Sequence, residues 1–214
     1  MIRTAKRQKF DKSAFFTYVK KNYRSILFFA LFFIGMIIGA MLIRNAPGET
    51  LDNLASITGG FVDKRAQQSF ADTLISSFMS NSLYLMLLFI FGFCAIAQPF
   101  ITAVPLFKGL GLGFSIGYFY AYYKLQGLLY VLLIILPGAL ITTAVVIAAC
   151  NQAYSLSLIF LRGINPNNNK SPNNQPSITI KKYMMRYVFF LVVILVSSSF
   201  EAICSSLFGR FFSF

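Results

Sequence analysis

The feature that most constrains this chain is the length of its uncharged stretches. Residues 25–43, 82–107 and 125–161 contain no Lys, Arg, Asp or Glu. A helix of about 20 apolar residues crosses the roughly 30 Å hydrocarbon core of a bilayer. Of the 214 residues, 57% are hydrophobic and only 12% are charged, which is more apolar surface than a water-soluble fold buries. The sequence therefore predicts a polytopic membrane protein of the all-α class.

The placement of the charged residues predicts the orientation. Residues 1–24 and 162–186 are rich in Lys and Arg, whereas residues 44–81 carry both signs of charge. Because cytoplasmic loops carry an excess of basic residues, we expect the two basic segments in the cytoplasm. The basic tail 1–24 is suited to resting on anionic lipid. Since nearly all of the net charge of +13 lies in these two basic segments, nucleic acid is not an expected partner.

The apolar stretches predict a bundle of about five transmembrane helices in one domain, residues 25–208, followed by a short C-terminal end, 209–214. The N-terminus is expected in the cytoplasm. Residues 44–81 form the expected external segment, and the Pro- and Asn-rich residues 162–186 form a cytoplasmic linker.

Two prolines are expected to interrupt helices, because proline lacks an N–H group and clashes with the preceding turn. Pro99 is expected to end the second helix before a hairpin at 99–105. Pro137 is expected to divide a short half-helix, 128–136, from a full span, 138–161.

The external segment is expected to contain an amphipathic helix, residues 61–81. Phe70, Leu74 and Phe78 form an i, i+4 row on this otherwise polar helix. Such a row is a candidate docking surface for a partner protein. A helix that packs on its own bundle explains the row equally well.

Glycines recur in the stretch FKGLGLGFSIGYFYAYYK, residues 107–124, although glycine costs about 0.5–1 kcal/mol relative to alanine in a helix. Inside lipid, helices associate through close backbone contact, which small residues allow. The expected packing positions form one stripe, a second stripe on the opposite side, and a matching face on the first helix: Gly109, Gly113 and Gly117; Gly111 and Ser115; Gly35 and Gly39. The neighbouring Lys108 is expected to extend to the membrane interface.

No residue pattern points to catalysis, a metal or a cofactor. The chain has no histidine, and its three cysteines lie in apolar segments without a CxxC pair. Glu201 is the one acid within an expected span. It is either a proton or ion site, a tie to a partner, or a residue that fixes helix packing.

Several of these features together resemble the stage II sporulation protein M family. They are the basic tail, the first helix with its GxxxG motif, the external amphipathic helix, the Pro99 break, FKGLGLGFSIGYF, ILPG and FEAICSSLF. The resemblance implies a role in endospore formation, in the mother-cell membrane at the division septum. It implies a complex with two enzymes that degrade peptidoglycan, an amidase and a lytic transglycosylase, during engulfment. The family member is then the scaffold that recruits them and is not itself an enzyme.

Two other functions remain open. A small transporter or channel subunit would use Glu201 and the helix break at Pro137. An assembly or insertion factor for other membrane proteins is the third possibility.

Overall fold

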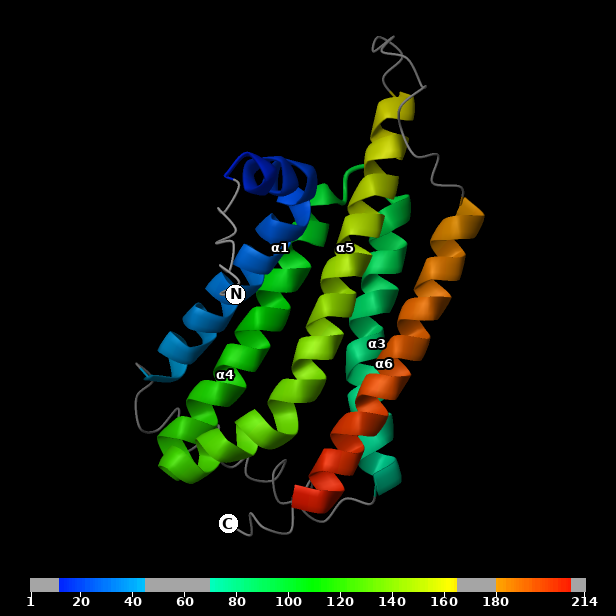
Figure 1. The fold of residues 1–214 in the computed structure, drawn as a ribbon. Helices are drawn as coiled ribbons and strands as arrows, with labels where there is room; N and C mark the ends of the chain where they lie inside the picture. The colour runs from blue at the N-terminus through cyan, green and yellow to red at the C-terminus, as the bar shows by residue number, and fades with distance from the viewer. Residues whose placement is uncertain (1–11, 45–69, 165–179, 209–214) are drawn as a thin grey trace, which may run out of the picture.

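The computed structural model describes residues 12–44, 70–164 and 180–208, with the side chains of 12–21, 122, 162–164 and 208 left aside. Within these ranges the chain is helical almost throughout and has no strand (Figure 1). The elements in order are α1 (Lys12–Arg44), α3 (Phe70–Phe93), α4 (Gln98–Tyr130), the π-helical turn η1 (Val131–Ile135), α5 (Leu136–Ile164) and α6 (Ile180–Phe208). Parts of the expected tail, external segment, linker and C-terminal end lie outside the described residues: 1–11, 45–69, 165–179 and 209–214.

Within the described residues, five helical segments are long and apolar enough to cross a membrane. They are Asn22–Arg44, Phe70–Phe93, Gln98–Ala121, Tyr123–Leu161 and Ile180–Leu207. The expectation of an all-α membrane bundle with five spans is confirmed.

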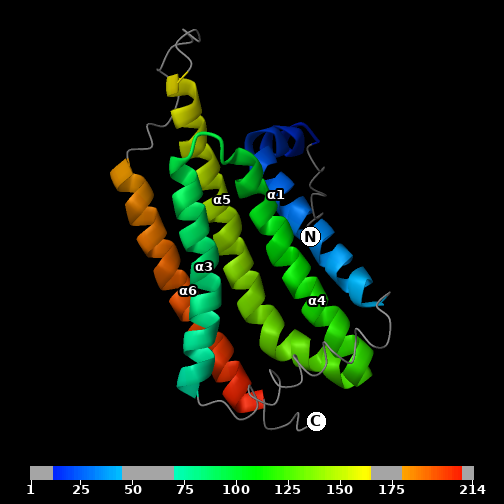
Figure 2. The ribbon, with the colours of Figure 1, turned by 180° about the vertical axis from the view of Figure 1, so that it is seen from behind.

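The bundle consists of two helix pairs with α5 between them. Figures 1 and 2 show α1 beside α4 on one side and α3 beside α6 on the other. The apolar core joins residues from both pairs and from α5, including Leu88, Ile101, Val146 and Ile194. We call the two ends of the bundle the Gln98 end and the Glu201 end, after the residues that lie toward them.

The turn between α3 and α4 lies earlier than expected. Residues 94–97 form it, and Ala97 N–H donates to Cys94 O at 3.3 Å. Pro99 lies in the first turn of α4, where its missing N–H costs nothing. The predicted hairpin at 99–105 is therefore wrong, because those residues are helical. Pro105 inside α4 leaves the carbonyl of Ile101 without its helical donor, and the Cys150 thiol of α5 donates to that oxygen at 3.8 Å.

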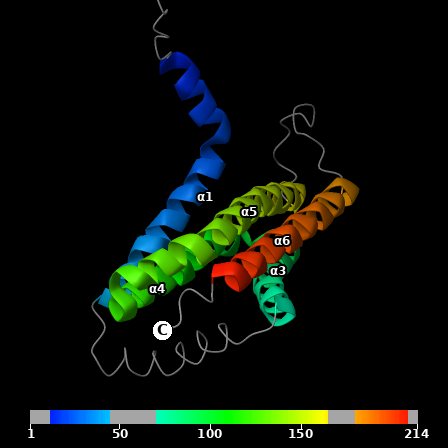
Figure 3. The ribbon, with the colours of Figure 1, turned by 60° about the horizontal axis from the view of Figure 1, so that its bottom comes forward.

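The expected break at Pro137 takes a different form. The chain bends sharply at Lys124, whose φ is 48° and ψ is −125°. A short helical arm then crosses the Glu201 end before α5 runs back through the bundle (Figures 1 and 3). Ahead of Pro137 the chain forms η1, in which Leu136 N–H donates to Val131 O. The wider turn accommodates the proline, and the helix continues through it into α5.

Helix α3 also differs from the prediction. Phe70–Phe93 is one continuous helix, and all of it belongs to a candidate span. Residues 70–81, expected in an external amphipathic helix, are therefore the first half of that span. Two polar residues among them, Thr73 and Ser77, are buried in the bundle, whereas Asp72 and Ser80 are exposed.

Candidate functional site

The glycines of α1 and α4 lie against each other. A Cβ atom added at Gly109 would meet the carbonyl oxygen of Phe32, and one added at Gly113 would meet that of Met36. In the other direction, the same addition at Gly35 or Gly39 would meet the backbone of α4. The two backbones are thus in direct contact, and we call this the glycine seam.

The remaining predicted packing positions differ from one another. A Cβ atom at Gly117 would lie 3.1 Å from the Cβ of Ile43, so this position extends the seam. At Gly111 no atom lies within 4 Å among the described residues, and Ser115 donates to Gly111 O of its own helix at 3.0 Å. The expected second packing face of α4 is therefore not occupied in the structure.

The predicted docking row is split between the surface and the core. Phe70 is 46% exposed, while Leu74 is half-buried. Phe78 is half-buried and packs against the apolar core. The more exposed row on this helix is the adjacent one, with Ile75 and Met79. Phe70 is therefore the one predicted docking residue with an exposed side chain.

Glu201 points into the bundle and is only 8% exposed. It lies beside the first turn of α5, because a Cβ added at Gly138 would be 3.4 Å from its Oε2 atom. Next to it, the Ser197 hydroxyl donates to Gly138 O at 3.1 Å. Glycine at position 138 thus gives the carboxyl group the space it occupies.

Lys108 does not extend to the membrane interface. Its ammonium group donates to Asn81 Oδ1 of α3 at 2.7 Å and lies 4.9 Å from the centre of the Tyr84 ring. The bundle therefore holds two ionisable side chains, Lys108 and Glu201, on its inner side. Because α4 begins at Gln98 and not after a hairpin at 99–105, Lys108 lies nearly three turns into the span.

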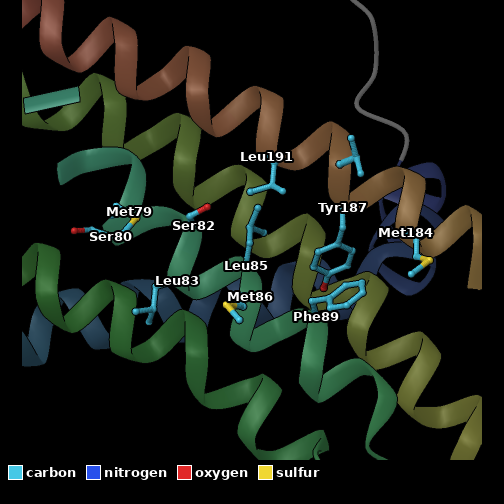
Figure 4. Close-up of a pocket in the computed structure, with 11 residues that line it drawn as sticks. Met79, Ser80, Ser82, Leu83, Leu85, Met86, Phe89, Met184, Tyr187 and Leu191 are labelled. Atoms are coloured by element: carbon cyan, nitrogen blue, oxygen red, sulfur yellow. The ribbon is translucent and has the colours of Figure 1, made fainter. Parts of the chain in front are cut away.

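An apolar groove of about 750 Å³ is lined by residues of α3 and α6, which pack against each other. Figure 4 shows Met79 and Met86 of α3 and Met184 and Leu191 of α6 along it. Its lining is almost entirely apolar, as expected for a surface in contact with lipid.

No cluster of three His, Cys, Asp or Glu residues that could hold a metal ion occurs in the described part of the chain. Cys94, Cys150 and Cys204 are free thiols. The site thus offers close helix packing and a buried polar interior.

This fold defines a multi-pass membrane protein built as a helical bundle. The family model for stage II sporulation protein M matches residues 28–206, which is most of the chain. The chain belongs to this family and is a sporulation membrane protein. Comparison with curated proteins and with solved structures returned no match.

Proposed function

We propose that the chain is the membrane scaffold of a peptidoglycan-degrading complex that acts at the septum during engulfment. In this proposal it recruits an amidase and a lytic transglycosylase and catalyses no reaction itself. The match to the sporulation family over residues 28–206 carries the proposal.

The glycine seam supports a scaffold role. Direct backbone contact between α1 and α4 leaves little freedom for these helices to move against each other. A fixed arrangement of helix ends presents a constant surface to partner proteins, which lowers the entropy cost of binding. The charge distribution predicts that the Glu201 end faces the cell wall, where the two enzymes would act.

Phe70 is the proposed contact residue on the described part of this end. It is the first residue of α3, and its ring is exposed. Leu207 of α6 is an exposed apolar residue at the same end, on another helix. The two residues therefore provide a matched pair of test and control positions.

The experiment is affinity purification of the tagged full chain from sporulating cells, with mass spectrometry of the proteins that accompany it. We expect both wall enzymes with the unchanged chain and with Leu207→Asp, and a loss of at least tenfold with Phe70→Asp. Equal recovery from the two variants would exclude Phe70 as a contact. Recovery of neither enzyme with the unchanged chain would contradict the scaffold proposal.

A second candidate function is transport, which the buried polar interior favours. Lys108, Asn81 and Glu201 provide more polar groups within the bundle than a purely structural core requires. Under this alternative, proteoliposomes containing the chain would show solute flux that falls with Glu201→Gln. Flux equal to that of empty liposomes for protons, Na⁺ and K⁺ would count against it.

A further inference from the structure

Buried polar side chains gather in the half of the bundle nearer Glu201. On α3, the buried Thr73 and Ser77 and the half-buried Asn81 follow one another at intervals of four residues, so they share one face. On α6, Ser198 and Glu201 are buried one turn apart. These polar residues lie on the inner sides of two neighbouring helices.

The register between α4 and α5 brings Lys108 and Thr143 to one level. The Cys150 thiol of α5 contacts the Ile101 carbonyl of α4. These helices run in opposite directions, so two turns toward the Glu201 end lead to Thr143 on α5 and to Lys108 on α4. Seven residues are close to two full turns. Thr143 therefore lies on the same face of α5 as Cys150, and Lys108 lies on the same face of α4 as Ile101.

A similar argument places Ser198 and Thr73 near one level of the bundle. The Tyr183 hydroxyl of α6 donates to Leu88 O of α3 at 3.3 Å. From this contact, an equal step of about four turns toward the Glu201 end leads to Ser198 on α6 and to Thr73 on α3. Polar residues of all four helices thus lie in this half of the bundle, between the level of Lys108 and that of Glu201, and we call this region the polar interior.

Two hydroxyl groups in this interior lack a partner. Thr143 is 3% exposed and Ser198 is 0% exposed. Neither Thr143 Oγ1 nor Ser198 Oγ has a hydrogen-bond partner among the described residues. A buried polar group without a partner costs about 1–3 kcal/mol. A bound water molecule supplies the missing bonds where several polar groups converge.

We propose that this polar interior is a binding site for water, open to the aqueous phase at the Glu201 end and reaching inward to Lys108. These groups favour water over a metal cation, because the Lys108 ammonium is positively charged and the two hydroxyl groups are neutral. The ammonium has a third N–H donor beyond its contacts with Asn81 and the Tyr84 ring. Water can accept from that donor and from the unpartnered hydroxyls.

The site ends at the apolar half of the bundle. Leu88, Ile101, Val146 and Leu156 pack there with little or no exposure. Water has no polar partners among these side chains, so it does not continue to the Gln98 end. The site is therefore a closed inlet in this conformation and not a passage through the membrane.

The test measures access of a water-soluble reagent to single cysteines. Cys94, Cys150 and Cys204 of the full chain are first replaced by alanine. Ser198→Cys and Thr143→Cys then place a thiol in the proposed site, and Val146→Cys places one in the apolar half, one turn from Thr143. Each variant is reconstituted in liposomes, and the rate of reaction with a small charged methanethiosulfonate is measured by mass spectrometry.

We expect Ser198→Cys and Thr143→Cys to react at least tenfold faster than Val146→Cys. Rates equal to that of Val146→Cys for both variants would overturn the proposal. Gel filtration checks that each variant remains folded and monodisperse. If one of the two site variants aggregates, the other gives the same comparison, since each thiol probes the same interior.

Discussion

At the scale of single residues, the missing side chains of glycine determine how α1 meets α4. Carbonyl oxygens of Phe32 and Met36 occupy the positions that Cβ atoms of Gly109 and Gly113 would take. Gly111 is on the same helix but faces open space. The glycines of this stretch thus have two different roles, although the sequence presents them alike.

The first prediction compares Gly113→Ala with Gly111→Ala. Alanine at 113 collides with the Met36 carbonyl, so we expect the unfolding free energy to fall by about 1–3 kcal/mol. Alanine at 111 meets no atom and has the higher helix propensity, so stability should stay equal or rise by about 0.5–1 kcal/mol. Denaturant titration in detergent, followed by circular dichroism, measures both. A similar loss for the two variants would contradict the glycine seam.

The Lys108 side chain does not reach the membrane interface, and the sequence alone does not reveal why. Its partner Asn81 is 27 positions away, on a helix that local spacing does not place beside it. The stripe of glycines at 109, 113 and 117 can be predicted from the sequence, because residues four apart share a helix face whatever the neighbouring helix is. Which stripe meets a neighbour depends on tertiary packing, so Gly111 and Ser115 were misplaced.

At the scale of elements, the ends of α3 and α4 depend on a residue far along the chain. The Ser157 hydroxyl of α5 lies 2.8 Å from Cys94 O and 3.3 Å from Ala95 O, within the turn that joins the two helices. It therefore satisfies carbonyl groups that have no helical partner at this helix end. No local pattern near Pro99 reveals this contact, which is why the hairpin was predicted several residues late.

The second prediction concerns this contact. Ser157→Ala removes the hydroxyl donor from Cys94 O and Ala95 O, although Cys94 O keeps its bond from Ala97 N–H, so we expect a loss of about 1 kcal/mol in unfolding free energy. Ser155 of the same helix donates to Asn151 O within α5 itself, which makes Ser155→Ala the matched control with a smaller effect. The same denaturant titration measures both. A larger loss for Ser155→Ala would contradict the role given to Ser157.

The third prediction concerns the bend between α4 and the short arm. Lys124 has a positive φ, a conformation that glycine adopts without strain. We expect Lys124→Gly to raise the unfolding free energy by about 1 kcal/mol. Gln126→Gly, two residues further along the helical arm, should lower it by about 0.5–1 kcal/mol. The midpoint of thermal unfolding in detergent gives the order of the two variants, and the reverse order would exclude a bend at Lys124.

At the scale of the whole molecule, two helix pairs and α5 form one bundle with unlike halves. The five spans were predictable because the fit to a bilayer depends on the length and composition of each stretch alone. The polar interior could not be predicted in this way, because four different helices contribute to it through Thr73, Lys108, Thr143 and Glu201. Sequence periodicity gives the face of each helix but not the order of helices around the core.

The fourth prediction tests whether Lys108 and Glu201 are coupled across the bundle. Lys108→Met leaves Asn81 Oδ1 without its donor and removes the cation from the interior that also holds Glu201, so it should destabilise the chain. The added effect of Glu201→Gln should be smaller in that background than in the unchanged chain. A double-mutant cycle of unfolding free energies measures this coupling, and strictly additive effects would contradict it.

The most direct measurement of the central claim is the release of muropeptides from purified peptidoglycan, analysed by liquid chromatography and mass spectrometry. The purified chain alone should release no more than a buffer control, whereas the complex purified through its affinity tag from sporulating cells should release cleaved fragments. Release by the chain alone, or none by the purified complex, would contradict the account of a membrane scaffold that recruits wall-degrading enzymes.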